Sequence, residues 1–152
     1  MALPTDPAGG NLLSHIDDTY PEVLLGGGAQ IYLYGVAYDR FYVGSNGYVT
    51  FGQGRDDWNE TLEEHFQAKQ IAALYDDLDP TDGGTLSYLQ LADRIAVTYW
   101  QVPEYSSGAT PDPNTIQVEL FFDGKIVLSF LTLEADDGLT GLSAGEGIDP
   151  EF

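Results

Sequence analysis

The amino-acid sequence predicts an all-β fold, a two-sheet antiparallel β-sandwich with long loops and at most one short helix. Glycine and proline interrupt the chain at short intervals, and the segments between them are rich in Val, Ile, Tyr, Phe and Thr. Short β-prone segments between turn residues are typical of a sandwich or barrel rather than of a helical fold. Apolar residues make up 43 % of the chain and aromatic residues 12 %. This composition is sufficient for a packed core and argues against a disordered chain.

The predicted strands are short and follow one another along nearly the whole chain. Each is rich in β-branched and aromatic residues, which favour the pleated, half-buried surface of a sheet. Only residues 57–69 have a composition that would tolerate one or two helical turns. The predicted strands are residues 30–34, 41–45, 48–52, 70–75, 84–90, 94–101, 115–122, 125–133 and 139–144.

Two dipeptides give the clearest hairpin signals. An Asn-Gly pair at 46–47 and an Asp-Gly pair at 123–124 each separate two apolar segments. Both pairs suit a two-residue type I′ turn, which needs positive φ at both positions. At the second hairpin this turn would place Leu120 opposite Val127. The strand at 126–131 is apolar on both faces, so it is expected to be central in its sheet and covered on both sides.

A chain of 152 residues predicts one domain. We expect an extended N-terminal segment (1–28), a core (29–147) and a short tail (148–152). Three consecutive glycines at 26–28 would separate the first segment from the core. A stretch rich in Pro, Ser and Gly at 103–114 predicts a long surface loop.

The charge of the chain limits its partners. Five Lys or Arg residues stand against 25 Asp or Glu residues, so the net charge is −20. Phosphate backbones and anionic lipids are repelled by this charge, and neither nucleic acid nor membrane insertion is expected. No apolar run approaches the roughly 20 residues that span a bilayer. The acidic excess would be relieved by bound divalent cations, and a salt-rich habitat would also explain it without any site.

Four blocks of the sequence, each short, together resemble the nidogen-type extracellular domain of nidogens, tectorins and membrane mucins. They are more similar still to bacterial versions in large secreted or surface proteins, and they run in the family's order from about residue 11 to residue 147. The blocks are YLYGVAYDRFYVGSNGYVTFG, QIAALYDDLDPTDGGTLSY, NTIQVELFFDGKIVLSF and GLTGLSAGEG.

The resemblance implies a non-catalytic adhesion or interaction module of a larger secreted or cell-surface protein, with an extracellular protein or glycan as its partner. The N-terminal ten residues have no basic start or apolar run, so the targeting signal is expected elsewhere in a longer polypeptide. The chain departs from the animal pattern because it has no cysteine. It also has Ala73-Leu74-Tyr75 where the family usually has Pro-Phe-Trp.

Four aspartates are crowded at the end of the predicted strand 70–75 and in the turn after it. Asp76, Asp77, Asp79 and Asp82 would repel one another unless a cation or hydrogen-bond donors gather around them. Ca²⁺ prefers several oxygen ligands, so these four residues form a candidate calcium site, although their spacing is not that of an EF-hand. The alternative is a solvated acidic turn whose carboxylates accept backbone N–H bonds.

A second acidic turn, Asp136-Asp137-Gly138, would either supply a further calcium ligand or be another polar turn.

Exposed aromatic residues are the remaining candidates for ligand binding. Trp58 lies in a polar stretch and Tyr105 in a predicted loop, and such side chains stack on sugar rings or anchor protein contacts. A carbohydrate-binding module using either residue is therefore an alternative function. Trp100 is adjacent to Tyr99 in a predicted strand and is expected to be a core residue.

Paired carboxylates also raise the alternative of a small glycan-active hydrolase. Asp77 with Asp79, or Glu104 with an aspartate of the turn, would form such a pair. No nucleophile motif accompanies them, and His15 and His65 are isolated in the sequence. The sequence therefore predicts a non-catalytic protein.

Overall fold

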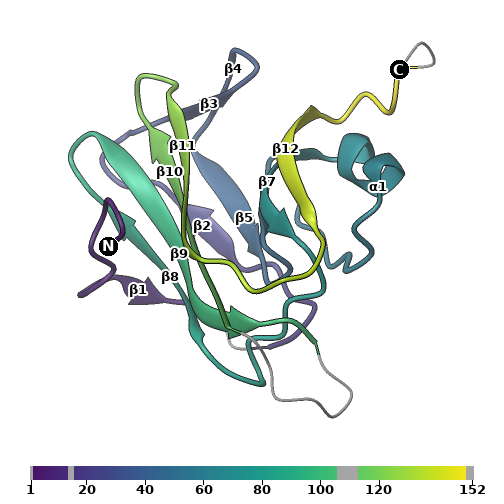
Figure 1. Ribbon diagram of the computed structural model, residues 1–152. Helices are drawn as coiled ribbons and strands as arrows, with labels where there is room; N and C mark the ends of the chain where they lie inside the picture. Colours follow the sequence, from purple (N-terminus) through teal and green to yellow (C-terminus); the bar gives the residue numbers. More distant parts are fainter. Residues whose placement is uncertain (1, 14–15, 106–112, 150–152) are drawn as a thin grey trace.

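The computed structural model describes residues 2–13, 16–105 and 113–149, and it confirms the predicted sandwich (Figure 1). Within these residues, two five-stranded antiparallel sheets pack together, with a separate two-stranded hairpin. The first sheet has the order β1 (Asn11–Leu12), β8 (Thr85–Gln90), β9 (Arg94–Pro103), β10 (Pro113–Phe121) and β11 (Ile126–Thr132). The second has the order β12 (Leu139–Ala144), β7 (Lys69–Tyr75), β6 (Tyr48–Thr50), β5 (Arg40–Gly44) and β2 (Glu22–Leu24). The hairpin consists of β3 (Ile31–Leu33) and β4 (Val36–Tyr38).

Every predicted strand is present, and the short strands β1, β2 and β4 are additional. The N-terminal segment 1–28 is therefore part of both sheets, because β1 pairs with β8 and β2 pairs with β5. Of the loop predicted at 103–114, residues 106–112 lie outside the described part of the chain, as does His15.

The core lies between the two sheets and follows the two-residue periodicity of the strands. Tyr99 of β9 is fully buried, and its hydroxyl lies 2.7 Å from the carbonyl oxygen of Gly44 and 2.9 Å from that of Tyr48. This buried hydroxyl therefore joins the first sheet to the β5–β6 hairpin of the second. The alternating core residues include Ile95, Val97 and Tyr99 of β9, Ile116, Val118 and Leu120 of β10, Phe41 and Val43 of β5, and Ile71 and Ala73 of β7.

The only helix among the described residues is α1 (Leu62–Gln67), which lies inside the range expected to tolerate one. Thr61 caps its N-terminus, because its side chain accepts a hydrogen bond from the amide of Glu64 at 3.1 Å. No helix in the described ranges is long and apolar enough to cross a membrane.

Both hairpin predictions were wrong in loop length. The β5–β6 register pairs Gly44 with Tyr48, and the β10–β11 register pairs Leu120 with Ile126 rather than with Val127. The first loop therefore has three residues (45–47), and so has the second (122–124), because the amide of Phe121 donates to the carbonyl of Lys125 at 2.9 Å. Within each loop only the last residue, Gly47 or Gly124, has positive φ. A three-residue loop that ends in a left-handed glycine is the next common hairpin connection, and the dipeptide alone does not distinguish it from a two-residue turn.

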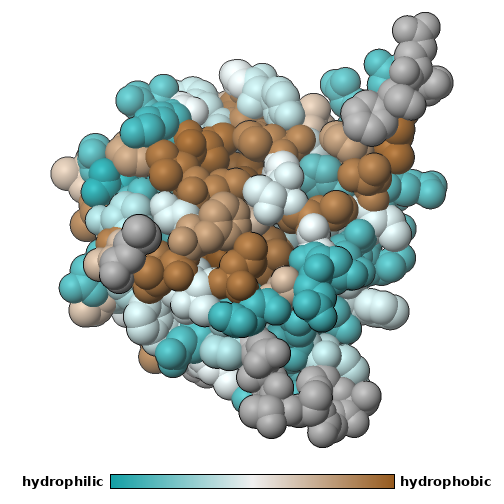
Figure 2. All heavy atoms as spheres, viewed as in Figure 1, coloured by the Kyte–Doolittle hydropathy of each residue, from teal (hydrophilic) through white to brown (hydrophobic). Residues whose placement is uncertain are grey.

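The prediction of a central, fully covered strand at 126–131 was also wrong. This segment forms β11, which is the edge of the first sheet, and most of its side chains are half-buried. Figure 2 shows hydrophobic side chains gathered on the face where Figure 1 places β11 and β12. Phe130 of β11 and Leu142 of β12 are among the exposed large apolar residues. The apolar residues on both faces of this strand predicted that it would be buried. An edge strand is covered less completely, so the prediction failed.

Candidate functional site

The acidic segment that follows β7 is where the chain crosses from the second sheet to the first. Leu78, in the middle of this segment, is completely buried and forms an isolated antiparallel bridge with Glu104. The amide of Asp79 donates to the carbonyl of Pro103 at 2.9 Å, and the amide of Tyr105 donates to the carbonyl of Asp77 at 2.6 Å. The segment is therefore held against the end of β9, and a further bond from the amide of Leu78 to the carbonyl of Asp76 at 2.8 Å forms a tight turn centred on Asp77.

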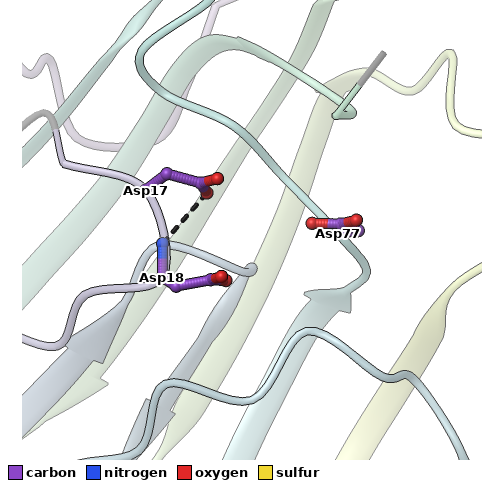
Figure 3. Close-up of side chains that lie close together, drawn as sticks. All are labelled: Asp17, Asp18 and Asp77. Carbon is purple, nitrogen blue, oxygen red and sulfur yellow. Dashed lines mark hydrogen bonds between the residues drawn. The ribbon is translucent and has the colours of Figure 1, made fainter. Parts of the chain in front are cut away.

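Asp77 faces a loop that precedes β2. Its carboxylate forms a cluster with those of Asp17 and Asp18, in which one oxygen from each residue lies within 4.8 Å of the others. Figure 3 shows Asp17 and Asp18 on one loop and Asp77 on the segment across from it. The amide of Asp18 donates to Asp17 Oδ1 at 2.9 Å, which fixes the first two side chains relative to each other. We name these three residues the open cluster, because Asp18 is exposed and the other two are partly exposed.

Asn46, in the β5–β6 turn, holds the open cluster to its surroundings. The side chain of Asn46 is fully buried, and its Nδ2 donates to Asp18 Oδ1 at 2.9 Å and to the carbonyl of Asp57 at 3.2 Å. Gly47 is required beside it, because a Cβ at this position would lie 1.6 Å from the carbonyl oxygen of Leu74. The turn that sequence analysis identified as a hairpin signal is therefore also a structural support of the site.

The open cluster forms one side of a pocket of about 400 Å³ whose other lining residues are Trp58 and Tyr105. Trp58 is 54 % exposed and Tyr105 is 56 % exposed. The loop that carries Trp58 is anchored by Arg55, which forms ion pairs with Asp57 and Glu64. We name this group of Asp17, Asp18, Trp58, Asp77 and Tyr105 the acidic pocket.

Asp76 belongs to a different group on the other side of the same segment. One carboxylate oxygen of Asp76 lies within 4.8 Å of oxygens from Glu60 and Asp137, and we name these three residues the closed cluster. Asp76 is only 4 % exposed. Its Oδ1 accepts a hydrogen bond from the amide of Asp77 at 2.8 Å, whereas no donor among the described residues bonds to its buried Oδ2. The carboxyl groups of Asp76 and Glu104 can share a hydrogen bond only when one of the two acids is protonated. Glu104 lies close enough to Asp76 to affect its protonation.

The fold and the order of these segments agree with one family of known proteins. The profile of a family described as NIDO related matches residues 8–149. The chain belongs to the NIDO-related family. No curated protein and no solved structure matches it. Family membership indicates an extracellular interaction module, a class of domain that is generally non-catalytic.

Electrostatics distinguish the two clusters of this NIDO-related domain. Burial, together with the charge of Glu104, raises the pKa of Asp76 from 3.8 to about 7. Burial and the nearby charges of Asp17 and Asp18 raise the pKa of Asp77 to about 6. The pKa of Asp17 is also raised, mainly by burial and then by Asp79. Each shift is caused first by burial, which disfavours the charged form, and then by a neighbouring carboxylate.

The structure divides the predicted calcium ligands of this NIDO-related domain among different environments. Asp77 joins the open cluster and Asp76 the closed one. The Oδ1 atom of Asp79 accepts bonds from the amide of Thr81 at 2.7 Å and from its hydroxyl at 2.6 Å. Asp82 is exposed, and neither it nor Asp79 belongs to a carboxylate cluster in the described ranges. Asp79 thus adopts the hydrogen-bonded turn that was the alternative to a metal ligand.

The aromatic predictions had mixed outcomes. Trp58 is exposed as predicted, and it shares the acidic pocket with Tyr105. The prediction that Trp100 is a core residue was wrong, because it is 38 % exposed while its neighbour Tyr99 is buried. Adjacent residues of a strand point to opposite faces of the sheet, so only one of the two can face the core. In β9 that residue is Tyr99.

Sequence reasoning missed several members of both clusters. Asp17 and Asp18 precede Asp77 by about 60 positions, and Glu60 lies in the loop before α1. The adjacent acidic pair at 17–18 was visible in the sequence, but nothing in it indicated a contact with Asp77. Only strand pairing brings these segments together.

Proposed function

We propose that this domain is a non-catalytic adhesion or interaction module of a larger secreted or cell-surface protein, and that the acidic pocket contacts a positively charged side chain of an extracellular protein. The observation that carries the proposal is the joint lining of one pocket by three carboxylates and two exposed aromatic side chains. Among the residues that the structure describes, no Lys or Arg lines this pocket.

The chemistry of the pocket suits a Lys or Arg side chain. A cation gains electrostatic attraction from the open cluster, where the pKa values of Asp17 and Asp77 are raised first by burial and then by neighbouring carboxylates. The faces of Trp58 and Tyr105 offer cation–π contacts, worth about 0.5–2 kcal/mol each. The net charge of −20 would increase the rate of encounter with a basic partner.

Two features favour a binding role over catalysis. The carboxyl group with the most strongly raised pKa among the acids, Asp76, is 4 % exposed and therefore has little contact with solvent or substrate. Asp79, one half of a predicted catalytic pair, is engaged with Thr81. The hydrolase alternative would be established by release of reducing sugar from a polysaccharide panel, and we expect none.

Carbohydrate binding is the second candidate function. It is favoured by the exposure of Trp58 and Tyr105 on one pocket, because aromatic side chains stack on sugar rings while carboxylates accept hydroxyl hydrogen bonds. The two candidates differ in their response to salt. Binding of a cation should weaken strongly between low and high NaCl, whereas binding of a neutral glycan should change little.

The test is an array of Lys-containing and Arg-containing peptides beside an array of neutral glycans, each measured at 50 and 300 mM NaCl. We expect salt-sensitive peptide binding, reduced about tenfold or more by Trp58→Ala or Asp77→Asn. Tyr34→Ala is the matched control, since Tyr34 is 63 % exposed and lies outside the acidic pocket. Salt-insensitive glycan binding lost in Trp58→Ala would favour the second candidate, and peptide binding unaffected by either pocket variant would refute the first.

A further inference from the structure

The closed cluster brings together carboxylates from three separate parts of the chain. Glu60 precedes α1, Asp76 follows β7, and Asp137 lies in the loop between β11 and β12. One oxygen from each lies within 4.8 Å of the others. Oxygens that bind one calcium ion at about 2.3–2.6 Å are at most about 5 Å apart, so this spacing is compatible with a common ion.

An independent observation at Asp76 points to a ligand at this position. The side chain is 96 % buried, given its 4 % exposure, and no donor among the described residues bonds to its Oδ2 atom. A Cβ built on Gly138 would lie 3.1 Å from Oδ2, so this atom faces the turn that carries Asp137. A buried polar atom without a partner costs about 1–3 kcal/mol, and more when it carries charge. A cation bound between Asp76 and Asp137 would remove this cost.

The protein supplies no cation of its own to this position. The ion pairs of Arg40, Arg55 and Arg94 involve other carboxylates, and in the described residues no ion pair joins a Lys or Arg to the closed cluster. Asp76 is therefore buried without a positively charged partner among the described residues.

We propose that Glu60, Asp76 and Asp137 bind a calcium ion. All three offer carboxylate oxygens, with no His or Cys in the group, so a hard cation is preferred to zinc or copper. Calcium is preferred to magnesium because the ligands come from separate loops and include one exposed residue, which suits a flexible coordination shell with waters better than a strict octahedron. Glu104, whose carboxyl group interacts with that of Asp76, would lie beside the bound ion.

The position of this site goes beyond the proposed binding function. Glu60 lies two residues after Trp58, Asp76 directly precedes Asp77, and Glu104 directly precedes Tyr105. An ion in the closed cluster would therefore connect the backbone segments that carry the acidic pocket. Its role is structural, and it does not require the pocket to bind any particular partner.

The test compares the thermal midpoint of the full chain in excess EDTA with that in CaCl₂ and in MgCl₂, at pH 7.5 and equal ionic strength. With calcium at about 100 times its Kd, ligand linkage predicts a rise in Tm of about 5–10 °C for a domain of this size. Isothermal titration calorimetry should give a binding stoichiometry of one calcium ion per chain. Asp137→Asn and Glu60→Gln should each weaken binding about tenfold or more.

Asp136→Asn is the matched control, because Asp136 is an exposed neighbour in the same turn and is not in the cluster. It should retain both the heat of binding and the rise in Tm. The proposal is overturned if calcium gives no more stabilisation than NaCl, or if Asp137→Asn and Glu60→Gln both keep the full calcium response. It is also overturned if the response is lost in Asp18→Asn but kept in Asp137→Asn, since the ion would then bind at the open cluster. None of these readouts depends on peptide or glycan binding.

Discussion

Asp76 and Asp77 are adjacent in the chain, yet they belong to different clusters with opposite properties. Asp77 contributes to an open cluster that reaches solvent and shares a pocket with two exposed aromatic side chains. Asp76 contributes to a closed cluster, is nearly completely buried, and has a carboxylate oxygen to which no donor among the described residues bonds. A tight turn after β7 separates them, because the amide of Leu78 donates to the carbonyl of Asp76 and bends the backbone at Asp77.

The difference shows how burial decides what a group of carboxylates can do. Solvent screens the charges of the open cluster, so its carboxylates can remain ionised and be offered to a partner. At Asp76 of the closed cluster, burial and the charge of Glu104 favour the neutral acid or a bound cation. The same residue type therefore suits recognition at one position and internal ion binding at the next.

The largest effect is expected from Asp76→Asn, and its sign should depend on calcium. In EDTA at pH 8, Asn removes a buried negative charge while keeping the oxygen that accepts the Asp77 amide, so stability should rise. In calcium the same variant loses a ligand, so stability should fall. The swing between the two conditions should be about 2–4 kcal/mol by urea denaturation.

Asp77→Asn is the comparison variant, and its effect should be smaller in both conditions. If Asp76→Asn changes the free energy of unfolding in the same direction with and without calcium, the two neighbouring aspartates do not differ as proposed.

Asn46→Ala should destabilise the fold around the open cluster without affecting calcium binding at the closed cluster. The variant removes the donor to Asp18 and to the carbonyl of Asp57, both of which are held by a fully buried side chain. The expected loss is about 1–3 kcal/mol, measured by urea denaturation. Asn59→Ala serves as the control, because Asn59 is exposed and contributes its backbone carbonyl to Tyr75. Equal losses in the two variants would argue against Asn46 as the support of the cluster.

The pH dependence without calcium should separate Asp76 from the remaining carboxylates. Its pKa is raised from 3.8 to about 7 in the folded protein, so between these values the native state binds more protons than the unfolded state. Stability therefore decreases as pH rises through this window. Relative to Asp76→Asn, the wild-type Tm in EDTA should fall by about 5–10 °C between pH 5 and pH 8.

Calcium competes with protons for the same carboxylates, so saturating calcium should reduce this fall or reverse it. A wild-type Tm that rises relative to Asp76→Asn in EDTA over the same range would contradict the raised pKa.

The smallest stability effects are expected at the aromatic side chains of the acidic pocket. Trp58→Ala and Tyr105→Ala should change the free energy of unfolding by about 0.5 kcal/mol or less, because both side chains are more than half exposed. Their contribution should appear in ligand binding instead. A large loss of stability in either variant would indicate that the side chain packs against the fold and is not held out for a partner.

Much of the fold could be predicted because it depends on local patterns. Turn residues and β-prone segments located every long strand, but the core face of β9 was mispredicted, because Trp100 was expected in the core and Tyr99 is buried there instead. The positions of the hairpin loops at 45–47 and 122–124 were predicted correctly, but each loop is one residue longer than predicted. The added residue shifts the register of the paired strands. The edge position of β11 was missed, because strand order depends on pairing between distant segments and not on the composition of one of them.

The sequence by itself determined that a sandwich would form, that carboxylates would crowd the end of β7, and that Trp58 would be available at the surface. These properties depend on neighbours along the chain: periodicity, turn residues and local polarity. Only the tertiary structure decided that Asp77 would meet Asp17 and Asp18 while Asp76 would meet Glu60 and Asp137. The physical reason is that strand pairing brings distant segments together, and the tight turn at Asp77 then places the two adjacent side chains beside different segments.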